Sequence, residues 1–337
     1  MCPPRKRSPN APPPPKPNSE PHLRPLIRPP SLSAGSRIAI LSPAGPVIED
    51  HLTPGLELLE SWGLVPVVLE QTLARSERRG YLAGSDAERL AALEDAFYRE
   101  DIDAILCARG GYGTTRLLEH LDPEKIREHA KLLVGFSDIT ALHLYLCHVA
   151  RVSSLHGPVL KSIRLHHEAT DPSLEHLRAA LFGERREFTI DGLNPVRPGS
   201  ATGTLLGGNL SLVQAMLASP YAPPLEGAIL FLEDVTEPDY RLDRLLTSVR
   251  MARGANKLAG LALGTFNGCG GVYIEEDAIP GFLQEIAAEF ECPVVTGLPV
   301  GHTAPNIALP LGTRATLDAT AGTLTVHQDA VTSKSSI

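Results

Sequence analysis

Length, composition and charge place the chain among ordinary globular proteins. It has 337 residues, of which 43% are hydrophobic and 21% charged, which is enough for two domains of average size. The formal net charge of −8 comes without a long basic run and argues against a nucleic-acid partner. No stretch approaches the roughly 20 apolar residues that span a bilayer, so no membrane partner is expected.

Cysteine usage and the chain ends give expectations about the compartment and the boundaries. Five cysteines without Cys-x-x-Cys spacing argue against a disulfide framework or a zinc ribbon and indicate a reducing compartment. Residues 1–33 are rich in proline and lack the apolar segment of a signal peptide, so a disordered tail is predicted there. Residues 329–337 are predicted to form a flexible C-terminal tail.

Strand and helix patterns alternate between residues 34 and 183. Short apolar runs that end in turn residues predict strands, and apolar residues at helical spacing predict the helices between them. Gly63 stands where a helix would end, and Ser85 where the next would begin. This alternation predicts a parallel sheet covered on both faces, in an N-terminal α/β domain of the flavodoxin-like type.

A second α/β pattern follows a polar, turn-rich segment. Residues 184–200 show no periodicity and are predicted to be the linker. Beyond them, strand patterns alternate with helical ones, and residues 315–317 and 323–326 form a closing hairpin pattern. The sequence therefore predicts a smaller C-terminal α/β domain over residues 201–328.

Two strand-to-turn passages in the N-terminal domain carry residues suited to catalysis. Ser137 lies between the apolar run 132–134 and a predicted helix, as in a nucleophile elbow. The alternative is that it only caps that helix, since Ile139 replaces the second glycine of Gly-x-Ser-x-Gly. The loop 109–113 has three glycines, which suit an oxyanion hole or a merely structural tight turn.

A serine nucleophile needs a base and a group that orients the base. His302 is flanked by small and turn-forming residues at the end of a predicted strand, which suits a base. Glu233 follows the apolar run 229–232, so its carboxylate is expected at the carboxyl end of a buried strand. The alternative for Glu233 is an ordinary ion pair with Arg241 or Arg244. His156, also at a turn, is a candidate for substrate contact.

Taken together, these residues resemble the LD-carboxypeptidase family of serine peptidases, which includes the hydrolases that give self-immunity to microcin C. The motifs that carry the resemblance occur in the family's order and are Ala108-Arg109-Gly110-Gly111-Tyr112-Gly113, Gly135-Phe136-Ser137-Asp138-Ile139-Thr140-Ala141-Leu142-His143, Gly207-Gly208-Asn209-Leu210, Phe231-Leu232-Glu233-Asp234 and Gly301-His302 through Asn306.

The resemblance implies a catalytic triad of Ser137, Glu233 and His302 at the interface between the two domains. It also implies an oxyanion hole from the backbone N–H groups of Gly111 and Asp138. Further substrate-binding candidates are Arg109, Gly110, Tyr112, His156 and Asn209. A cytoplasmic homodimer without metal or cofactor, acting on a small muropeptide, is the expected assembly.

The function expected from this resemblance is hydrolysis of the L,D-peptide bond to the terminal D-alanine of murein tetrapeptides. Two alternatives stay open at this point. One is a microcin C-type hydrolase that uses the same triad on acyl-adenylate analogues. The other is a non-catalytic binding protein on the same scaffold, in which Ser137 is only a helix cap.

Overall fold

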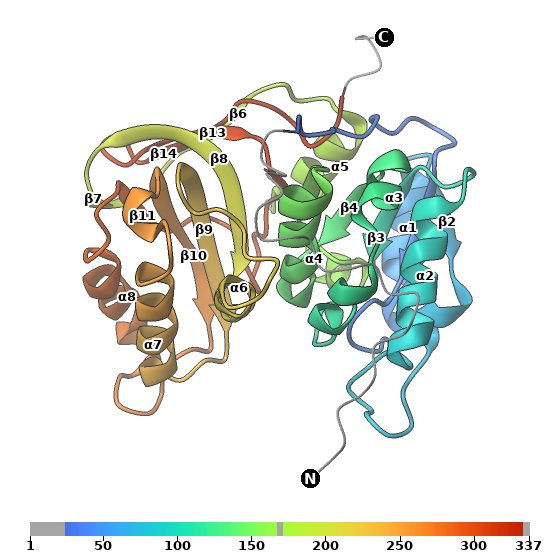
Figure 1. Ribbon diagram of the computed structural model, residues 1–337, viewed down its shortest axis with the longest axis horizontal. Coiled ribbons are helices and arrows are strands. Elements are labelled where there is room, and N and C mark those ends of the chain that lie inside the picture. Colours follow the sequence, from blue (N-terminus) through green and yellow to red (C-terminus); the bar gives the residue numbers. More distant parts are fainter. Residues whose placement is uncertain (1–23, 167–170, 333–337) are drawn as a thin grey trace.

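The computed structural model describes residues 24–166 and 171–332, which form two α/β units lying side by side (Figure 1). Each unit is built on its own sheet, with helices packed against it. The predicted fold class, two α/β domains with a parallel sheet in the first, is confirmed. Within the described ranges, no helix has the length and apolar character needed to cross a membrane.

The N-terminal sheet is parallel except for one edge strand. In spatial order its strands are β12 (Leu309–Leu311), β5 (Ser154–His156), β4 (Leu132–Gly135), β3 (Ala104–Cys107), β1 (Arg37–Leu41) and β2 (Val65–Val68). The helices of this unit are α1 (Thr53–Ser61), α2 (Asp86–Tyr98), α3 (Pro123–Glu128), α4 (Thr140–Tyr145) and α5 (Ser173–Phe182).

Successive residues of the central strands face opposite sides of this sheet, as strand geometry requires. Ile38 and Ile40 pack into a hydrophobic cluster with Leu59 of α1. Ala39 and Leu41 pack into another cluster, which includes helices α2 and α4. Both faces are therefore covered, and this explains why the strands read as continuous apolar runs in the sequence.

The C-terminal sheet has a parallel centre and antiparallel flanks. Its order is β6 (Phe188–Ile190), β14 (Thr323–Val326), β13 (Arg314–Asp318), β8 (Ser200–Asn209), β9 (Ala228–Val235), β10 (Gly260–Asn267), β11 (Val294–Thr296) and β7 (Asn194–Arg197). Its helices are α6 (Leu210–Leu217), α7 (Asp239–Arg250) and α8 (Ile279–Ala287).

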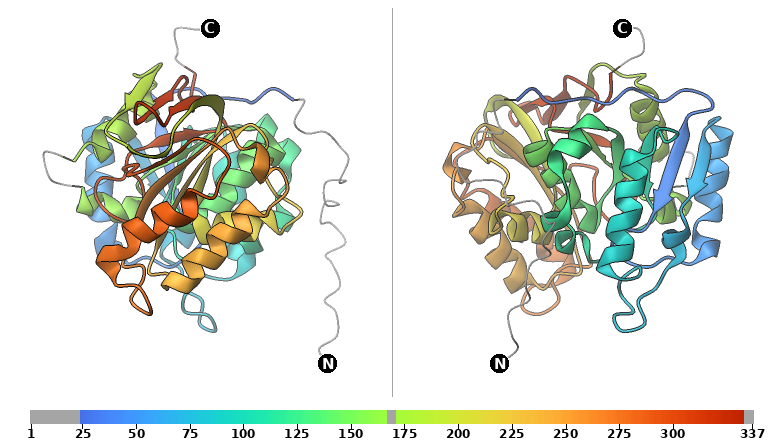
Figure 2. Two further views of the ribbon diagram at one scale, coloured as in Figure 1. Left: turned by 90° about the vertical axis from the view of Figure 1, so that its left-hand side faces the viewer. Right: turned by 45° about the vertical axis from the view of Figure 1, so that its right-hand side comes forward.

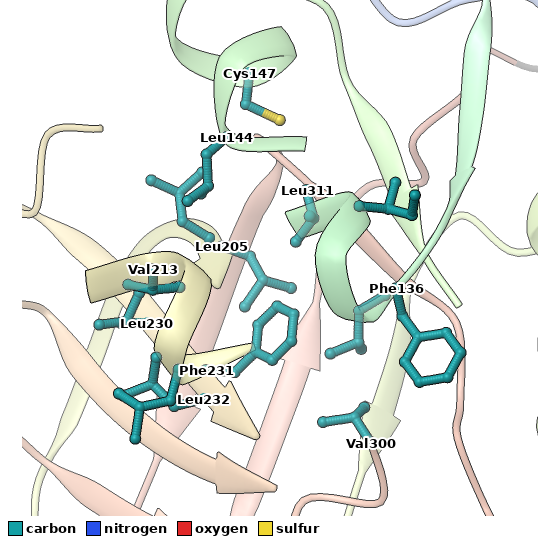
Figure 3. Packing of buried hydrophobic residues seen from close by; sticks show 14 of the residues in the cluster. Phe136, Leu144, Cys147, Leu205, Val213, Leu230, Phe231, Leu232, Val300 and Leu311 are labelled. Carbon is teal, nitrogen blue, oxygen red and sulfur yellow. The ribbon is translucent and has the colours of Figure 1, made fainter. Parts of the chain in front are cut away.

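One hydrophobic cluster runs through the junction of the two units (Figure 3). Phe136 and Leu144 enter it from the N-terminal unit, whereas Leu205, Phe231 and Val300 enter it from the C-terminal unit. All five are at most 7% exposed. Because separating the units would expose this apolar surface to water, their relative position is fixed by packing.

Two of the predicted boundaries differ from the structure. The predicted linker contributes β6 and β7, which pair at the outer edges of the C-terminal sheet. Both are short, and Pro195 is tolerated in β7 because an edge strand needs fewer ladder hydrogen bonds. These features leave little periodicity to read in the sequence.

The predicted tails are also shorter than expected. Residues 24–33 run along the top of the molecule in both views of Figure 2 and meet the C-terminal end of the described chain. Leu32 and Val331 are buried, and the N–H of Ser31 donates to the carbonyl of Thr332 (3.0 Å). The rest of the predicted tails, residues 1–23 and 333–337, lies outside the described residues.

Local helix signals are confirmed in one place and wrong in another. Ser85 caps α2, with its hydroxyl accepting from the N–H of Glu88 and its own N–H donating to the Glu88 carboxylate. Leu117, Leu118 and Leu121 predict a helix after Gly113, but the chain forms two short 3-10 turns there, Thr114–Arg116 and Leu118–His120. Asp122 already caps the next helix, so too few residues remain for a regular one.

A substitution at Gly207 tests the close packing of β8 on β9. Gly207 has a φ of 145°, and an added Cβ would overlap the carbonyl oxygen of Phe231. Gly207→Ala should therefore lower the unfolding temperature in calorimetry, since overpacking a core typically costs roughly 1–3 kcal/mol. In the control, Gly281→Ala, the added methyl meets nothing within 4 Å, so stability should not fall. Equal unfolding temperatures for the two variants would contradict this packing.

Candidate active site

Ser137 lies in a sharp turn between strand β4 and helix α4. Its φ of 65° is in the left-handed region, which non-glycine residues rarely occupy, whereas the preceding Phe136 is extended. The N-cap of α4 is Ile139, and no side-chain hydrogen bond caps that described helix. The structure therefore argues against the helix-cap alternative. The strained turn is instead typical of a nucleophile elbow.

The glycine-rich loop lies directly against this turn. A Cβ on Gly110 would lie 2.8 Å from the Cβ and 3.0 Å from the Oγ of Ser137, so only glycine leaves the serine its space. The N–H of Thr114 donates to the Asp138 carboxylate (2.8 Å), and the Thr114 hydroxyl donates to the Asp138 carbonyl (2.6 Å). Burial raises the pKa of Asp138, while these hydrogen bonds oppose the rise. The loop and the turn are thereby held as one unit.

His302 and Glu233, both from the second unit, are in contact. His302 Nδ1 lies 2.8 Å from Glu233 Oε2; the glutamate side chain is 0% exposed and the histidine side chain 19%. Burial alone would lower the pKa of His302, but the hydrogen bond and charge of Glu233 outweigh it and raise this pKa above the ordinary value. Burial raises the pKa of Glu233, and the hydrogen bond with His302 opposes that rise. With Nδ1 engaged, Nε2 is the nitrogen of His302 that can accept a proton.

Two glycines and the side chain of Asn306 hold Glu233 and His302 in position. A Cβ on Gly264 would lie 3.3 Å from the Glu233 Cβ, and one on Gly301 would lie 3.2 Å from Glu233 Oε2. The N–H of Gly301 donates to Asn306 Oδ1 (3.1 Å), which closes the turn that carries His302. Substituting Gly301 would crowd the buried carboxylate, and substituting Gly264 would crowd Val300 and the Glu233 Cβ.

Contacts across the junction link the turn of Ser137 to the C-terminal unit. The ring of Phe136, the residue before Ser137, has its centroid 4.9 Å from that of His302. Two residues after Asp138, the hydroxyl of Thr140 accepts from the N–H of Asn209 (3.0 Å). The structure thus places Ser137 between two residues that contact the C-terminal unit. Glu233 and His302 lie on the other side of this junction.

Three of the five predicted substrate-binding residues, Gly110, His156 and Asn209, are buried instead. His156 is 0% exposed, with its ring centroid 6.0 Å from that of Phe136 and 5.0 Å from that of Phe231. Burial, followed by the charge of His143, lowers the pKa of His156 to about 3, so this ring is neutral. Asn209 caps α6 and donates through Nδ2 to Asp234 (2.8 Å). His156 therefore packs beside Phe136, the residue before Ser137, and Asn209 holds the start of α6.

The other candidates lie on the glycine loop. Arg109 donates through Nη1 to the carbonyl of Pro46 (2.6 Å), and Tyr112 is 47% exposed beside Tyr81, with 5.9 Å between the ring centroids. Gly111 has a φ of 108° and is exposed. The structure therefore leaves Arg109, Gly111 and Tyr112 at the surface, where a ligand can reach them.

Sequence reasoning assigned no role to Phe136, Thr140 or Asn306. All three lie within the quoted motifs, but their roles depend on partners more than 60 residues away, apart from the contact of Asn306 with Gly301. Proximity in the sequence to Ser137 and His302 was the only signal that could have found them.

Comparison with known proteins identifies the family. Models of the N-terminal and C-terminal domains of LD-carboxypeptidases match residues 38–157 and 202–317. The chain is 40% identical over 314 residues to a Streptomyces coelicolor protein whose name assigns it provisionally to the carboxypeptidases, covering 92% of this chain and 99% of that protein. It is 34% identical over 295 residues to the murein tetrapeptide carboxypeptidase of Pseudomonas aeruginosa, covering 84% and 93%. The chain belongs to the LD-carboxypeptidase family.

Solved structures show the same architecture. The muramoyltetrapeptide carboxypeptidase of Oxalobacter formigenes is 30% identical, with a TM-score of 0.74 over 86% of this chain and 98% of that one. The microcin C7 self-immunity protein has a TM-score of 0.81 over 91% of this chain and 100% of that one, at 22% identity. The second likeness shows a shared fold.

Gly110→Ala tests how closely the glycine loop fits the serine turn. The added methyl has no room beside Ser137, so the hydroxyl should be displaced and turnover of a murein tetrapeptide should fall by about 10²-fold or more. The circular dichroism spectrum should stay that of the native protein, because the clash is confined to two loops. Wild-type turnover in this variant would contradict the geometry.

Proposed function

We propose that the chain is a serine carboxypeptidase that hydrolyses the bond to the terminal D-alanine of murein tetrapeptides. The observation that carries the proposal is the buried Glu233–His302 pair across the junction from the strained Ser137 turn. The names of the Pseudomonas aeruginosa relative and the Oxalobacter formigenes structure support the choice of substrate.

In the proposed first step, His302 Nε2 takes the proton of Ser137 Oγ while this oxygen attacks the carbonyl of the scissile bond. The negative charge that develops on the carbonyl oxygen is stabilised by the backbone N–H groups of Gly111 and Asp138. The protonated His302 then gives its proton to the amine of D-alanine, the C–N bond breaks, and an ester to Ser137 remains.

Water completes the reaction by the reverse proton transfers. His302 takes a proton from a water molecule as the oxygen attacks the ester carbonyl, and it returns this proton to Ser137 Oγ when the tripeptide leaves. Glu233 holds the ring through Nδ1 in both steps and stabilises the imidazolium. A cytoplasmic location and a homodimer belong to the same proposal and rest on the family resemblance.

A microcin C-type hydrolase is the second candidate, because the same three side chains would serve it. It is supported by a shared fold at low identity, whereas the murein peptide reading is supported by relatives of at least 30% identity. Assaying both substrates with the same preparation separates the two, with the higher kcat/KM expected for the tetrapeptide.

Ser137→Ala tests the nucleophile. Without the hydroxyl no ester can form, so release of D-alanine from a murein tetrapeptide should fall by about 10⁴-fold or more, with the fold retained. Chromatographic detection of free D-alanine measures this loss. Undiminished release would overturn the assignment.

The pH profile tests the role of Glu233. Only neutral His302 can accept the proton, so kcat/KM should fall as pH drops through the pKa of His302, which Glu233 holds above the ordinary value. Glu233→Gln removes the charge, so the midpoint of this acid limb should move to lower pH. The rate should also fall on the order of 10²–10⁴-fold.

The exposed Glu226, which pairs with Lys257, provides the matched control. Glu226→Gln should keep the wild-type midpoint of the acid limb and the wild-type rate. An unchanged or higher midpoint in Glu233→Gln would show that Glu233 does not set the pKa of the base.

A further inference from the structure

Helix α2 carries a fully buried arginine, Arg89, whose side chain is 0% exposed. A guanidinium stays charged in proteins, so this burial must be compensated by hydrogen-bond partners. Burial lowers the pKa of Arg89, and the hydrogen bond and charge of Asp86 oppose this fall. The proposed proton transfers do not involve Arg89, and its partners indicate what it does.

The guanidinium joins the glycine loop to the loop after β1. Arg89 Nη1 donates to the carbonyl of Pro43 (2.6 Å) and to the carbonyl of Gly113 (2.9 Å). A Cβ on Gly113 would lie 2.7 Å from this nitrogen, so a side chain there would displace the guanidinium. The two loops also meet directly, since the N–H of Gly45 donates to the carbonyl of Gly110 (2.9 Å).

Arg89 is held in turn by a carboxylate on its own helix. Asp86, in the first turn of α2, accepts from Arg89 Nη2 (2.5 Å) and from Nε of Arg116 (2.8 Å). The hydrogen bond from Arg116 lowers the pKa of Asp86, which keeps this carboxylate ionised at neutral pH. The guanidinium is therefore fixed on one side by Asp86 and aimed at the two loop carbonyls on the other.

One peptide group of the glycine loop links Arg89 to the turn of Ser137. The carbonyl of Gly113 accepts from Arg89, while the N–H of the same peptide, which belongs to Thr114, donates to the Asp138 carboxylate (2.8 Å). Burial raises the pKa of Asp138, and the charge of Arg89 is among the influences that oppose the rise. Charge-assisted hydrogen bonds are stronger than neutral ones, so this peptide has one favoured orientation.

Both proposed oxyanion donors lie next to this peptide. Gly111 is two residues before Gly113, and the N–H of Asp138 belongs to the residue that directly follows Ser137. The separation of the two donors therefore depends on how the glycine loop is held against Asp138. Such donors stabilise a transition state because they are aimed before the reaction begins.

We propose that Arg89 is a positioning residue, which holds the N–H groups of Gly111 and Asp138 at the separation that the oxyanion requires. The inference rests on the proposed function and adds to it a buried charge outside the triad. Because the side chain is fully buried, it acts through the loop and does not touch the substrate. Its loss should therefore lower kcat and leave KM little changed.

Arg89→Met tests this role by removing the charge and the N–H donors while keeping an unbranched side chain. For release of D-alanine from a murein tetrapeptide, kcat should fall by about 10²-fold, as for the loss of an oxyanion donor. Arg89→Lys keeps the charge but not the fork that reaches two carbonyls and Asp86, so its kcat should lie between those of Arg89→Met and the wild type. Wild-type kcat in either variant would overturn the proposal, and Arg89→Lys decides alone if Arg89→Met does not fold.

Arg127→Met is the matched control. Arg127, on α3, also donates to backbone carbonyls, those of Pro25 (2.9 Å) and Arg151 (2.9 Å), and these partners lie outside the glycine loop and the turn of Ser137. Its loss should lower the unfolding temperature in calorimetry, because buried carbonyls lose a donor, and leave kcat at the wild-type value. An equal fall of kcat in Arg127→Met and Arg89→Met would show that kcat only follows stability, which would overturn the positioning role.

The rate at which a fluorophosphonate probe labels Ser137 separates this inference from the choice of substrate. Negative charge develops on the phosphoryl oxygen as the serine attacks, so the rate constant should fall by about tenfold or more in Arg89→Met and stay unchanged in Arg127→Met. Equal rate constants for Arg89→Met and the wild type would overturn the positioning role. A wild type that is labelled but releases no D-alanine would overturn the proposed function instead.

Discussion

The buried carboxylate of Glu233 is the constraint on which the site depends. A charge removed from water costs several kcal/mol unless a partner compensates it, and the partner here is His302 at 2.8 Å. Gly264 and Gly301 pack closely against this side chain, and Asn306 closes the turn that presents the histidine. The same contact raises the pKa of the proposed base, so the interaction that stabilises the buried charge also prepares the histidine for catalysis.

The proposed mechanism needs Ser137 near this pair, and contacts at the junction between the two units link the turn of Ser137 to His302. Phe136 packs against His302 on one side of Ser137, and Thr140 binds the backbone of Asn209 on the other. Phe136 also belongs to the apolar cluster in Figure 3, which packs across the same junction. The strained φ of Ser137 is therefore maintained by tertiary packing on each side of the turn, and no local preference of the sequence would hold it.

Local patterns predicted much of this molecule. The continuous apolar runs gave the central strands, and Ser85 gave the start of α2. Long-range pairing was harder to predict. Residues 309–311, with a proline in the middle, carry no strand signal, yet they form β12 at the edge of the N-terminal sheet because β5 offers them a partner. The ordering of residues 24–33 has the same cause, since it depends on contacts with the other end of the chain.

In the candidate site, too, local sequence patterns identified single residues, whereas the contacts between them depend on long-range packing. The sequence could nominate Ser137, Glu233 and His302, but only the fold shows that Glu233 and His302 touch and that the serine does not cap its helix. The fold also brings Arg75, Arg109 and Lys161, from three separate segments, around one pocket.

The most direct test of the central claim is to label the native protein with a fluorophosphonate probe and map the modified residue by mass spectrometry. Ser137 should be labelled in the native protein and unlabelled in His302→Ala, since the probe reacts with a serine that has a base beside it. Labelling of Ser137 that persisted in His302→Ala, or labelling of a different serine, would contradict this claim.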